Sequence, residues 1–594
     1  MFKLKKFFKI QKLQLVLNTT STSTTTYPFS RFFSLSSTTT SLPREQAEYD
    51  VVIVGGGPAG LSAAIRLKQL ASDKLTVCVV EKGHEVGAHI LSGNVFEPRA
   101  LNELIPDWKE RGAPLETPAT DDVFLFLTEK HSIQLPTIPM LHNHGNFITS
   151  LSQVSRWLGK QAEELGVDIL TGQPVSEVLY SQDGKGVIGV ATADVGLGKD
   201  GKQKESFARG MELHAKQTLF AEGARGSCSE EVMARFNLRK ECDPQTYGLG
   251  LKEVWRIPKE KARPGYIQHT LGWPLPMSVY GGSFLYHMKP DLVLIGYVVG
   301  LDYANPYISP YQEFQRWKHH PSVKQHLEGG ECVQYGARVI NEGGLQSIPK
   351  LTFPGGALIG CSAGFLNVPK IKGTHTAMKS GMIAADAIAD LLLSSSSSSS
   401  SSLPLEALQY SENIKKSWIY EELKTVRNFH PAFKHGLLPG MAYSGLSAYL
   451  LKGNEPWTFR NTKTDAEKTL PSFNFSPIKY PKPDGKISFD LLTNLARSGT
   501  NHEHDQPSHL KIKTGMEKVP SEISYKTFAA PESRFCPARV YEYPEPAEKG
   551  ETPQLVINAA NCLHCKACSI KTPKNYIKWT VPEAGGGGPS YEIM

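Results

Sequence analysis

The sequence predicts an α/β protein of the multidomain α+β kind. It would contain a Rossmann-like dinucleotide-binding domain interrupted by a second domain, and a ferredoxin-like domain at the C-terminus. Three observations lead to this fold class. A strand-like run at residues 49–53 passes through a glycine loop into an apolar-faced helix, and a second strand, glycine turn and helix recur at residues 357–393. Four cysteines gather near the C-terminus, at positions 536, 562, 565 and 568.

The glycine loop has the spacing Gly55-x-Gly57-x-x-Gly60 of a dinucleotide-binding unit. The first glycine permits the turn, the second lets the backbone approach a pyrophosphate, and the third lets the helix pack on the strand. A second strand at residues 76–80 ends in Glu81, about 21 residues past Gly60. A carboxylate at this position accepts a hydrogen bond from a ribose hydroxyl. A structural glycine-rich turn is the alternative. The predicted cofactor-binding residues are Val54, Gly55, Gly56, Gly57, Pro58, Ala59, Gly60, Leu61, Ser62 and Glu81.

The domain organisation follows from which later segments add strands to the sheet of the dinucleotide-binding domain. The strand at residues 213–222 and the strand–turn–helix at 357–393 read as parts of the dinucleotide-binding domain, so we assign 45–245 and 345–460 to it. The serine run at 394–402 would be a linker within this domain. Residues 246–344 would form the inserted domain, and 461–594 the cysteine-containing domain.

Residues 1–44 carry several lysines and arginines and no acidic residue, and they are rich in serine and threonine. This composition is typical of a mitochondrial presequence; a disordered tail and, less well matched, a secretory signal are the alternatives. These residues account for the net charge of +7, so the charge gives no reason to expect a nucleic-acid partner. No apolar run of 18 residues follows residue 45, so no transmembrane helix is predicted.

The spacing Cys562-x-x-Cys565-x-x-Cys568, with a remote Cys536 followed by proline, is that of a ferredoxin cluster site. Thr572 stands where a second cluster would need its cysteine, so we predict one 4Fe-4S cluster with these four ligands. A structural zinc site is the alternative.

The sequence indicates lesser roles for one tyrosine, three histidines and the remaining cysteines. Tyr541 is either a donor to a cluster sulfur or a packed side chain. His89, His375 and His564 have no partners at metal-binding spacing and are interpreted as hydrogen-bonding residues. The remaining cysteines are interpreted as core or incidental thiols: Cys78, Cys228, Cys242, Cys332 and Cys361.

From residue 49 to the C-terminus, the chain resembles the mitochondrial electron transfer flavoprotein–ubiquinone oxidoreductase family. The resemblance rests on the glycine loop, on the cysteine tail, and on residues 280–287, 300–303, 314–321, 367–381 and 498–505. The presequence and the serine run are not covered by it.

The resemblance implies an FAD-binding domain, an inserted ubiquinone-binding domain and a ferredoxin-like 4Fe-4S domain. It also implies that the backbone of Gly281 and Gly282 binds the quinone headgroup, although this glycine pair by itself is equally consistent with a hairpin turn. The protein would lie on the matrix face of the inner mitochondrial membrane as a monotopic protein, dipping into it near residues 101–122 and 426–447. Burial of both segments in the core is the alternative.

The implied activity passes electrons from reduced electron transfer flavoprotein through the 4Fe-4S cluster and FAD to ubiquinone, linking fatty-acid and amino-acid dehydrogenation to the respiratory chain. The cofactors carry this chemistry, which agrees with the lack of a recognisable catalytic triad or carboxylate pair. Two alternatives remain: a flavin-dependent reductase or monooxygenase acting on an apolar substrate, and a non-catalytic assembly or carrier protein with a structural cluster.

Overall fold

The computed structural model describes residues 43–395, 404–546, 548, 550–583, 585 and 587–594. The predicted presequence, apart from its last two residues, lies outside them, and so does most of the serine run. The first serines of that run, Ser394 and Ser395, continue the preceding helix, so the predicted linker begins two residues too early.

The first large sheet carries the glycine loop. Its strand order is β19-β20-β13-β1-β2-β8, and β10 and β9 extend it from β13. The pairs made by β1 with β13 and β2, by β2 with β8 and by β13 with β20 are parallel. The strands are β1 (Gln46–Val54), β2 (Val77–Val80), β8 (Asp168–Leu170), β9 (Val175–Tyr180), β10 (Val187–Thr192), β13 (Glu212–Phe220), β19 (Thr352–Phe353) and β20 (Gly356–Leu358).

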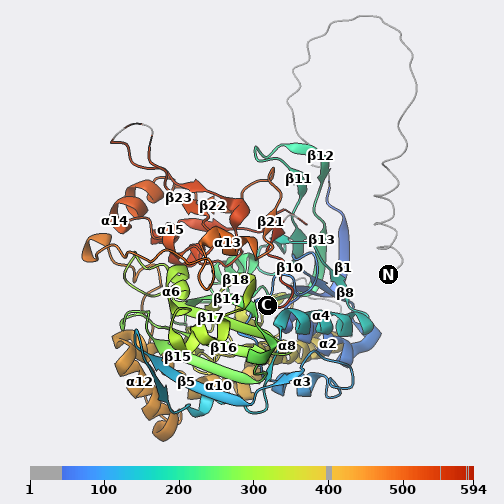
Figure 1. Ribbon diagram of the computed structural model, residues 1–594. Helices are drawn as coiled ribbons and strands as arrows, with labels where there is room; N and C mark the ends of the chain where they lie inside the picture. The colour runs from blue at the N-terminus through green and yellow to red at the C-terminus, as the bar shows by residue number, and fades with distance from the viewer. Residues whose placement is uncertain (1–42, 396–403, 547, 549, 584, 586) are drawn as a thin grey trace, which may run out of the picture. The chain divides into compact units, whose positions relative to one another are not determined.

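Helices pack against this sheet, which explains why its central strands are continuous apolar runs. Helix α2 (Pro58–Ala71) follows the glycine loop and packs closely against α8 (Thr374–Ser395) (Figure 1). A Cβ at Gly381 would lie 2.3 Å from the Ala59 carbonyl oxygen, so a glycine is needed where the two helices meet. The other helices of this region are α3 (Arg99–Leu104), α4 (Leu151–Glu164) and α5 (Ser227–Arg235).

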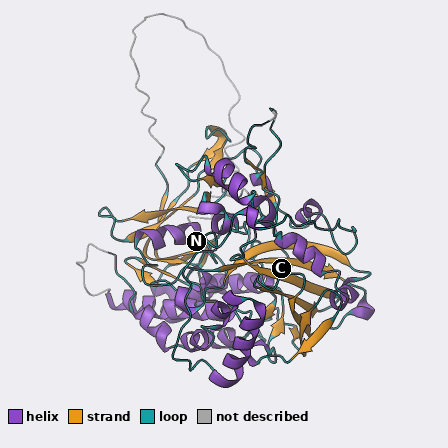
Figure 2. Ribbon diagram, turned by 90° about the vertical axis from the view of Figure 1, so that its left-hand side faces the viewer, coloured by secondary structure: helices purple, strands orange, loops and turns teal. Residues whose placement is uncertain are grey.

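The second large sheet has the order β18-β14-β17-β16-β15-β5-β6 and is antiparallel except for the β15–β5 pair. Its strands, drawn in orange with the others in Figure 2, are β5 (Asp121–Leu127), β6 (Ser132–Leu135), β14 (Tyr247–Arg256), β15 (Tyr266–Gly272), β16 (Gly281–Met288), β17 (Leu292–Gly300) and β18 (Glu331–Asn341). The sequence boundaries counted β5 and β6 with the dinucleotide-binding domain, whereas both strands extend the second sheet. Helices α6 (Pro310–Trp317) and α7 (Pro321–Leu327) connect β17 to β18.

A helical segment follows the serine run. It comprises α9 (Gln409–Lys416), α10 (Trp418–Thr425), α11 (Phe429–Ala432), α12 (Leu437–Leu446) and one π-helical turn (Ser447–Leu451). Among the described residues, no helix is both long and apolar enough to cross a membrane.

The C-terminal region has short elements: α13 (Leu491–Ala496), α14 (Lys526–Phe528), α15 (Glu532–Phe535), α16 (Cys568–Lys571), and the strand pairs β21 (Asn501–His502) with β26 (Gly587–Gly588), β22 (Leu510–Ile512) with β25 (Ile577–Trp579), and β23 (Tyr541–Glu542) with β24 (Val556–Ile557). Its apolar residues share one hydrophobic cluster with the second sheet. Two smaller groups of strands complete the fold: β3 (Val95–Phe96), β4 (Thr117–Pro118) and β7 (Phe147–Ile148), and the pair β11 (Val195–Leu197) and β12 (Gln203–Ala208).

Candidate functional site

The glycine loop has the geometry that a dinucleotide requires. Gly55 has φ +111°, and a Cβ there would lie 2.4 Å from the Ala221 carbonyl oxygen. A Cβ at Gly60 would lie 2.2 Å from the Gly55 carbonyl oxygen, so α2 packs against the loop only because residue 60 is glycine. Gly57 caps α2 without a side-chain hydrogen bond, and a Cβ there would meet nothing within 4 Å. The helix N-terminus is thus open to a pyrophosphate, and the residues fit FAD.

Glu81 lies at the end of β2, beside the loop, as predicted. Its Oε2 accepts a hydrogen bond from the Gly56 N–H at 2.9 Å, and its Oε1 accepts one from the Gly83 N–H at 2.7 Å. Each carboxylate oxygen has a second lone pair, so the carboxylate is fixed by the backbone while it retains capacity to accept from ribose hydroxyls.

A cavity of about 540 Å³ joins the glycine loop to the second sheet. Pro58 of the loop lines it, and so do both glycines of the predicted quinone site. Residues of β14, β16, β17 and β18 form one wall, while residues 366–374 and the segment 429–449 contribute others. The structure therefore brings two predicted sites, distant in sequence, to one mostly apolar cavity, the usual character of a site for a large aromatic ligand.

Gly281 and Gly282 are the first residues of β16 and do not form a hairpin turn. They pair with Val299 and Val298 of β17, while the pairing of β16 with β15 ends at Ser283. The backbone edge of the glycine pair that faces β15 therefore extends past that ladder. A Cβ at Gly281 would lie 2.4 Å from the Val298 carbonyl oxygen, so packing alone already favours glycine there.

The four predicted cluster ligands are buried together. Cys536 follows α15, Cys562 and Cys565 lie in the loop before α16, and Cys568 begins α16. Beyond the effect of burial, Cys536 and Cys565 each lie close enough to other cysteines of the set for like charge to raise their pKa, as expected of thiolates that share one metal group.

Burial raises the pKa of Cys536 and of Cys562 to about 12, and it also raises the pKa of Cys565 and Cys568. Four thiolates in this place need a positively charged group to stabilise them, which a cluster core provides. Tyr541 is also buried; burial raises the pKa of Cys568, the nearby Tyr541 hydroxyl opposes that rise, and this hydroxyl has no hydrogen-bond partner among the described residues.

The cysteine loop is attached to a wall of the cavity. The Val339 N–H of β18 donates to the Cys565 carbonyl oxygen at 3.1 Å. The neighbouring residues Arg338 and Ile340 line the cavity. β18 is the edge strand of its sheet, so its outer backbone edge binds the cysteine loop while the side chains on one of its faces line the cavity.

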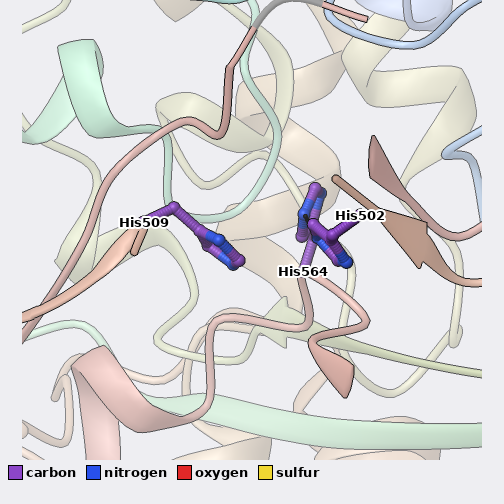
Figure 3. Close-up of side chains that lie close together, drawn as sticks. All are labelled: His502, His509 and His564. Atoms are coloured by element: carbon purple, nitrogen blue, oxygen red, sulfur yellow. Dashed lines mark hydrogen bonds between the residues drawn. The ribbon is translucent and has the colours of Figure 1, made fainter. Parts of the chain in front are cut away.

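His564 is a hydrogen-bonding residue, as predicted, and it also has histidine neighbours in space that the sequence spacing does not show. Its ring nitrogens lie within 4.8 Å of nitrogens of His502 and His509 (Figure 3). The His564 Nε2 is 3.0 Å from the His502 Nε2, and its Nδ1 is 2.9 Å from the Lys82 Nζ. Lys82 and His502 take up both ring nitrogens of His564, so we interpret these three residues as a hydrogen-bonded chain against which the His509 ring packs. The partners were missed because more than 50 residues separate His564 from each of them.

His375 also gains partners. Its Nε2 lies 2.8 Å from a Glu422 oxygen and 3.7 Å from a Glu97 oxygen. Lys370 pairs with both carboxylates, so this group is an ion-pair network that holds the segment 366–374 of the cavity wall against α10.

The two predicted membrane segments differ. In 101–122 the apolar side chains Leu101, Leu104, Ile105, Trp108 and Leu115 are all buried in the core, so the structure does not support this segment as a membrane contact. In the second segment, α12 exposes Leu438 by 60% and Leu446 by 44%, and the next turn exposes Leu450 by 74%.

Three family descriptions match the chain. "ETF-QO, ubiquinone-binding" matches residues 247–340, "Electron transfer flavoprotein-ubiquinone oxidoreductase, 4Fe-4S" matches 485–592, and "NAD(P)-binding Rossmann-like domain" matches 53–107. The fold and these sites define an oxidoreductase that combines a flavin with an iron–sulfur cluster.

Curated relatives agree over nearly the whole chain. The mitochondrial electron transfer flavoprotein-ubiquinone oxidoreductases of Rattus norvegicus, Arabidopsis thaliana and Dictyostelium discoideum are 55%, 56% and 55% identical. Each match covers 93% of this chain and 90%, 85% and 92% of the respective relative. Among solved structures, a geranylgeranyl bacteriochlorophyll reductase-like protein from Thermoplasma acidophilum covers 68% of this chain and 89% of its own, with 19% identity and a TM-score of 0.49. The chain belongs to the electron transfer flavoprotein–ubiquinone oxidoreductase family.

Membership makes the chain an electron-transferring-flavoprotein dehydrogenase with FAD and a 4Fe-4S cluster as cofactors and ubiquinone as acceptor. The sequence predicted the loops for these cofactors but gave no sign of two basic side chains of the cavity wall, Lys252 and Arg338. Each lies in a stretch that reads as an ordinary strand, and only the pairing of β14 with β18 places them on one face.

Proposed function

We propose that the described cavity and the cysteine loop form one electron route, from reduced electron transfer flavoprotein through the cluster and FAD to ubiquinone. The observation that carries this proposal is β18, which lines the cavity with one face and holds the Cys565 carbonyl with a backbone N–H. The bound flavin and cluster supply the electron chemistry. The chain binds them, orients them and excludes water.

Each cofactor has its own residues. FAD is held by the predicted residues 54–62 and by Glu81, with the pyrophosphate at the N-terminus of α2 and a ribose at the Glu81 carboxylate. The cluster is held by Cys536, Cys562, Cys565 and Cys568, whose burial excludes water from the sulfurs.

Ubiquinone occupies the part of the cavity lined by Gly281 and Gly282, with its headgroup on the free backbone edge of β16. The Gly282→Ala variant tests this assignment. Its Cβ would lie 3.0 Å from Leu271 Cδ2 and from the Thr270 carbonyl oxygen, so the change is small but narrows the edge. We expect a raised KM for a short-chain ubiquinone and unchanged reduction of FAD by the flavoprotein. An unchanged KM would place the quinone elsewhere.

We further propose that the protein attaches to the matrix face of the inner mitochondrial membrane through the surface around α12 and the turn after it. Exposed Leu438, Leu446 and Leu450 supply apolar contacts, and Lys434 and Lys452 flank them. Met441 and Tyr449 of the same surface line the cavity, so a quinone would enter from the lipid without crossing water.

The attachment is tested by sedimentation of the full chain with liposomes that contain anionic lipid. A Leu446→Ser/Leu450→Ser variant should bind at least tenfold more weakly, because each exposed leucine contributes about 1–2 kcal/mol when buried in lipid. Leu70→Ser, which changes an equally exposed leucine on α2, is the matched control and should bind normally. Equal binding of all three proteins would refute this surface.

The activity as a whole is tested by mixing the purified protein anaerobically with reduced electron transfer flavoprotein and ubiquinone. We expect the flavin of the protein to bleach and ubiquinol to form. Turnover that depends on a nicotinamide cofactor instead would favour a flavin-dependent reductase of the same fold.

A further inference from the structure

Lys252 of β14 is buried without a hydrogen-bond partner, which distinguishes it from the other buried lysines of the described residues. Its side chain is 1% exposed, and no described residue accepts a hydrogen bond from its Nζ. The others all have acceptors. Lys318 pairs with Glu253 at 2.9 Å, and carbonyl oxygens accept from Lys68, Lys372, Lys566 and Lys571.

The sheet around Lys252 offers it no acceptor. Its cross-strand neighbours are Gly296 of β17 and Gly336 of β18. The space that a side chain at Gly296 would take is filled by the Phe284 ring, and that at Gly336 by Leu91 and Tyr591. Burial lowers the pKa of Lys252 well below its usual value, and no carboxylate opposes the shift. Such a group costs free energy in the fold alone and calls for a ligand.

The cavity is where that ligand would lie. Lys252 lines it, and the next row of the same sheet face contains Gly250, Val298 and Gly282. Residues two apart in a strand share a face, so Lys252 is one row from the glycine pair assigned to the quinone. Arg338, the basic residue in the row of Gly250, already donates to the His89 carbonyl oxygen, whereas the Lys252 amine is an unused donor.

We propose that Lys252 donates a hydrogen bond to a carbonyl oxygen of the redox ring bound in this cavity and so favours the reduced ring. The inference rests on the proposed function, which puts such rings here. The shared chemistry is a conjugated ring that gains negative charge at its oxygens when it accepts electrons, and either the flavin or the quinone headgroup supplies it. The amine keeps its protons and no bond is made at Lys252. A donor fixed in a site that excludes water stabilises the charge strongly.

The test is the Lys252→Met variant of the full chain, measured with and without FAD. Methionine has nearly the same length and no polar atom, so the FAD-free protein should unfold at an equal or higher temperature than the wild type. Lys68→Met is the matched control: it removes the acceptor-bound amine of a buried lysine that does not line the cavity. It should lower the unfolding temperature and leave the flavin potential unchanged.

Two measurements on the loaded protein identify the ring. If the flavin is the acceptor, the ratio of reduced to oxidised FAD at a fixed ambient potential should fall at least about tenfold in Lys252→Met, because the charged oxygen of the reduced ring loses its donor. If the quinone is the acceptor, the flavin potential stays constant and the KM for ubiquinone rises about tenfold. The Lys252→Arg variant, which keeps a hydrogen-bond donor, should shift less in either measurement.

Two results would overturn the proposal. One is a flavin potential and a quinone KM that both stay within about twofold of wild type at full FAD content. The other is an FAD-free Lys252→Met protein that unfolds several degrees earlier, because the amine would then have its partner within the fold. Failure of the proposed function looks different: reduced flavoprotein would not bleach the wild-type flavin at all.

Discussion

The glycine loop at residues 54–60 and the cysteine loop at 562–568 are both turns shaped to hold a cofactor, but they use opposite parts of the chain. The glycine loop offers backbone N–H groups and has no side chain where a pyrophosphate would lie. Neutral N–H groups at a helix start do not need a ligand for the chain to fold. The cysteine loop offers buried side chains whose thiolate form burial disfavours. The difference teaches that the first site is preformed, whereas the second depends on its cofactor for stability.

Removal of a cluster ligand should therefore have the largest effect. In Cys565→Ala we expect the 4Fe-4S cluster to be lost, and reduction of ubiquinone by electron transfer flavoprotein to fall by more than about 100-fold, since even residues outside the ligand set typically cost 10–100-fold. Iron content and steady-state kinetics measure both. Cys242→Ala, which changes a cysteine outside the sites, is the control. Full activity without a cluster would contradict an electron route through it.

Two alanine substitutions in the glycine loop distinguish a glycine that the fold requires from a glycine that FAD binding requires. Gly55→Ala forces a side chain into φ +111° and against the Ala221 carbonyl, so the FAD-free protein should lose about 1–3 kcal/mol of stability. Gly57→Ala meets nothing in the fold but occupies the approach to the pyrophosphate, so it should keep its unfolding temperature and bind FAD about tenfold more weakly. Flavin fluorescence titration and thermal unfolding report the two effects. The same defect in both variants would mean that the loop is only a structural turn.

The ion-pair network that joins Glu422 of α10 to the cavity wall should make a smaller, pH-dependent contribution to the free energy of unfolding. Burial alone would raise the pKa of Glu422, but hydrogen bonds from His375 and Asn367 and the charge of Lys370 lower it to about 2. The folded pKa is below the unfolded value of about 4.3, so the stabilisation is present above that pH and is lost as the pH falls toward 2.

At pH 7 the Glu422→Gln variant should accordingly lose about 1–3 kcal/mol of stability, and the difference from wild type should shrink when thermal unfolding is repeated at pH 3.5. The neighbouring exposed Glu421→Gln is the control. A difference that is independent of pH would show that Glu422 acts through packing and not through its charge.

The smallest effect is expected from Tyr541→Phe. The Tyr541 hydroxyl is buried near Cys568 without a hydrogen-bond partner in the described residues, so it can donate to a cluster sulfur. Loss of that donor, worth about 1 kcal/mol, should lower the cluster potential and decrease the reduced fraction of cluster a few-fold at fixed ambient potential. EPR-monitored redox titration measures it. An unchanged potential would leave Tyr541 as a packed side chain.

The sequence predicted what depends on short local patterns. The loop at Gly55, Gly57 and Gly60, the acid Glu81 and the four cysteines were all recognisable because each works through its spacing along the chain. The parallel sheet around β1 followed from strand–turn–helix signals, and the helix at 374–393 was predicted almost to its ends.

What the sequence did not reveal depends on strands and loops meeting in space. Lys252 has no acceptor because its cross-strand neighbours are Gly296 and Gly336, and His564 contacts His502. All of these neighbours are remote in sequence. The segments 101–122 and 426–447 were both predicted to contact the membrane, and only packing shows that the apolar side chains of the first face the core. The residues 121–135 read as part of the first domain because pairing with β15 leaves no local signal.

The most direct test of the whole account is anaerobic EPR and metal analysis of the purified, reduced protein, combined with its visible spectrum. We predict one FAD and four irons per chain, and a reduced-cluster signal that is lost in the oxidised protein. A colourless protein, or one whose cysteines hold zinc, would contradict the account.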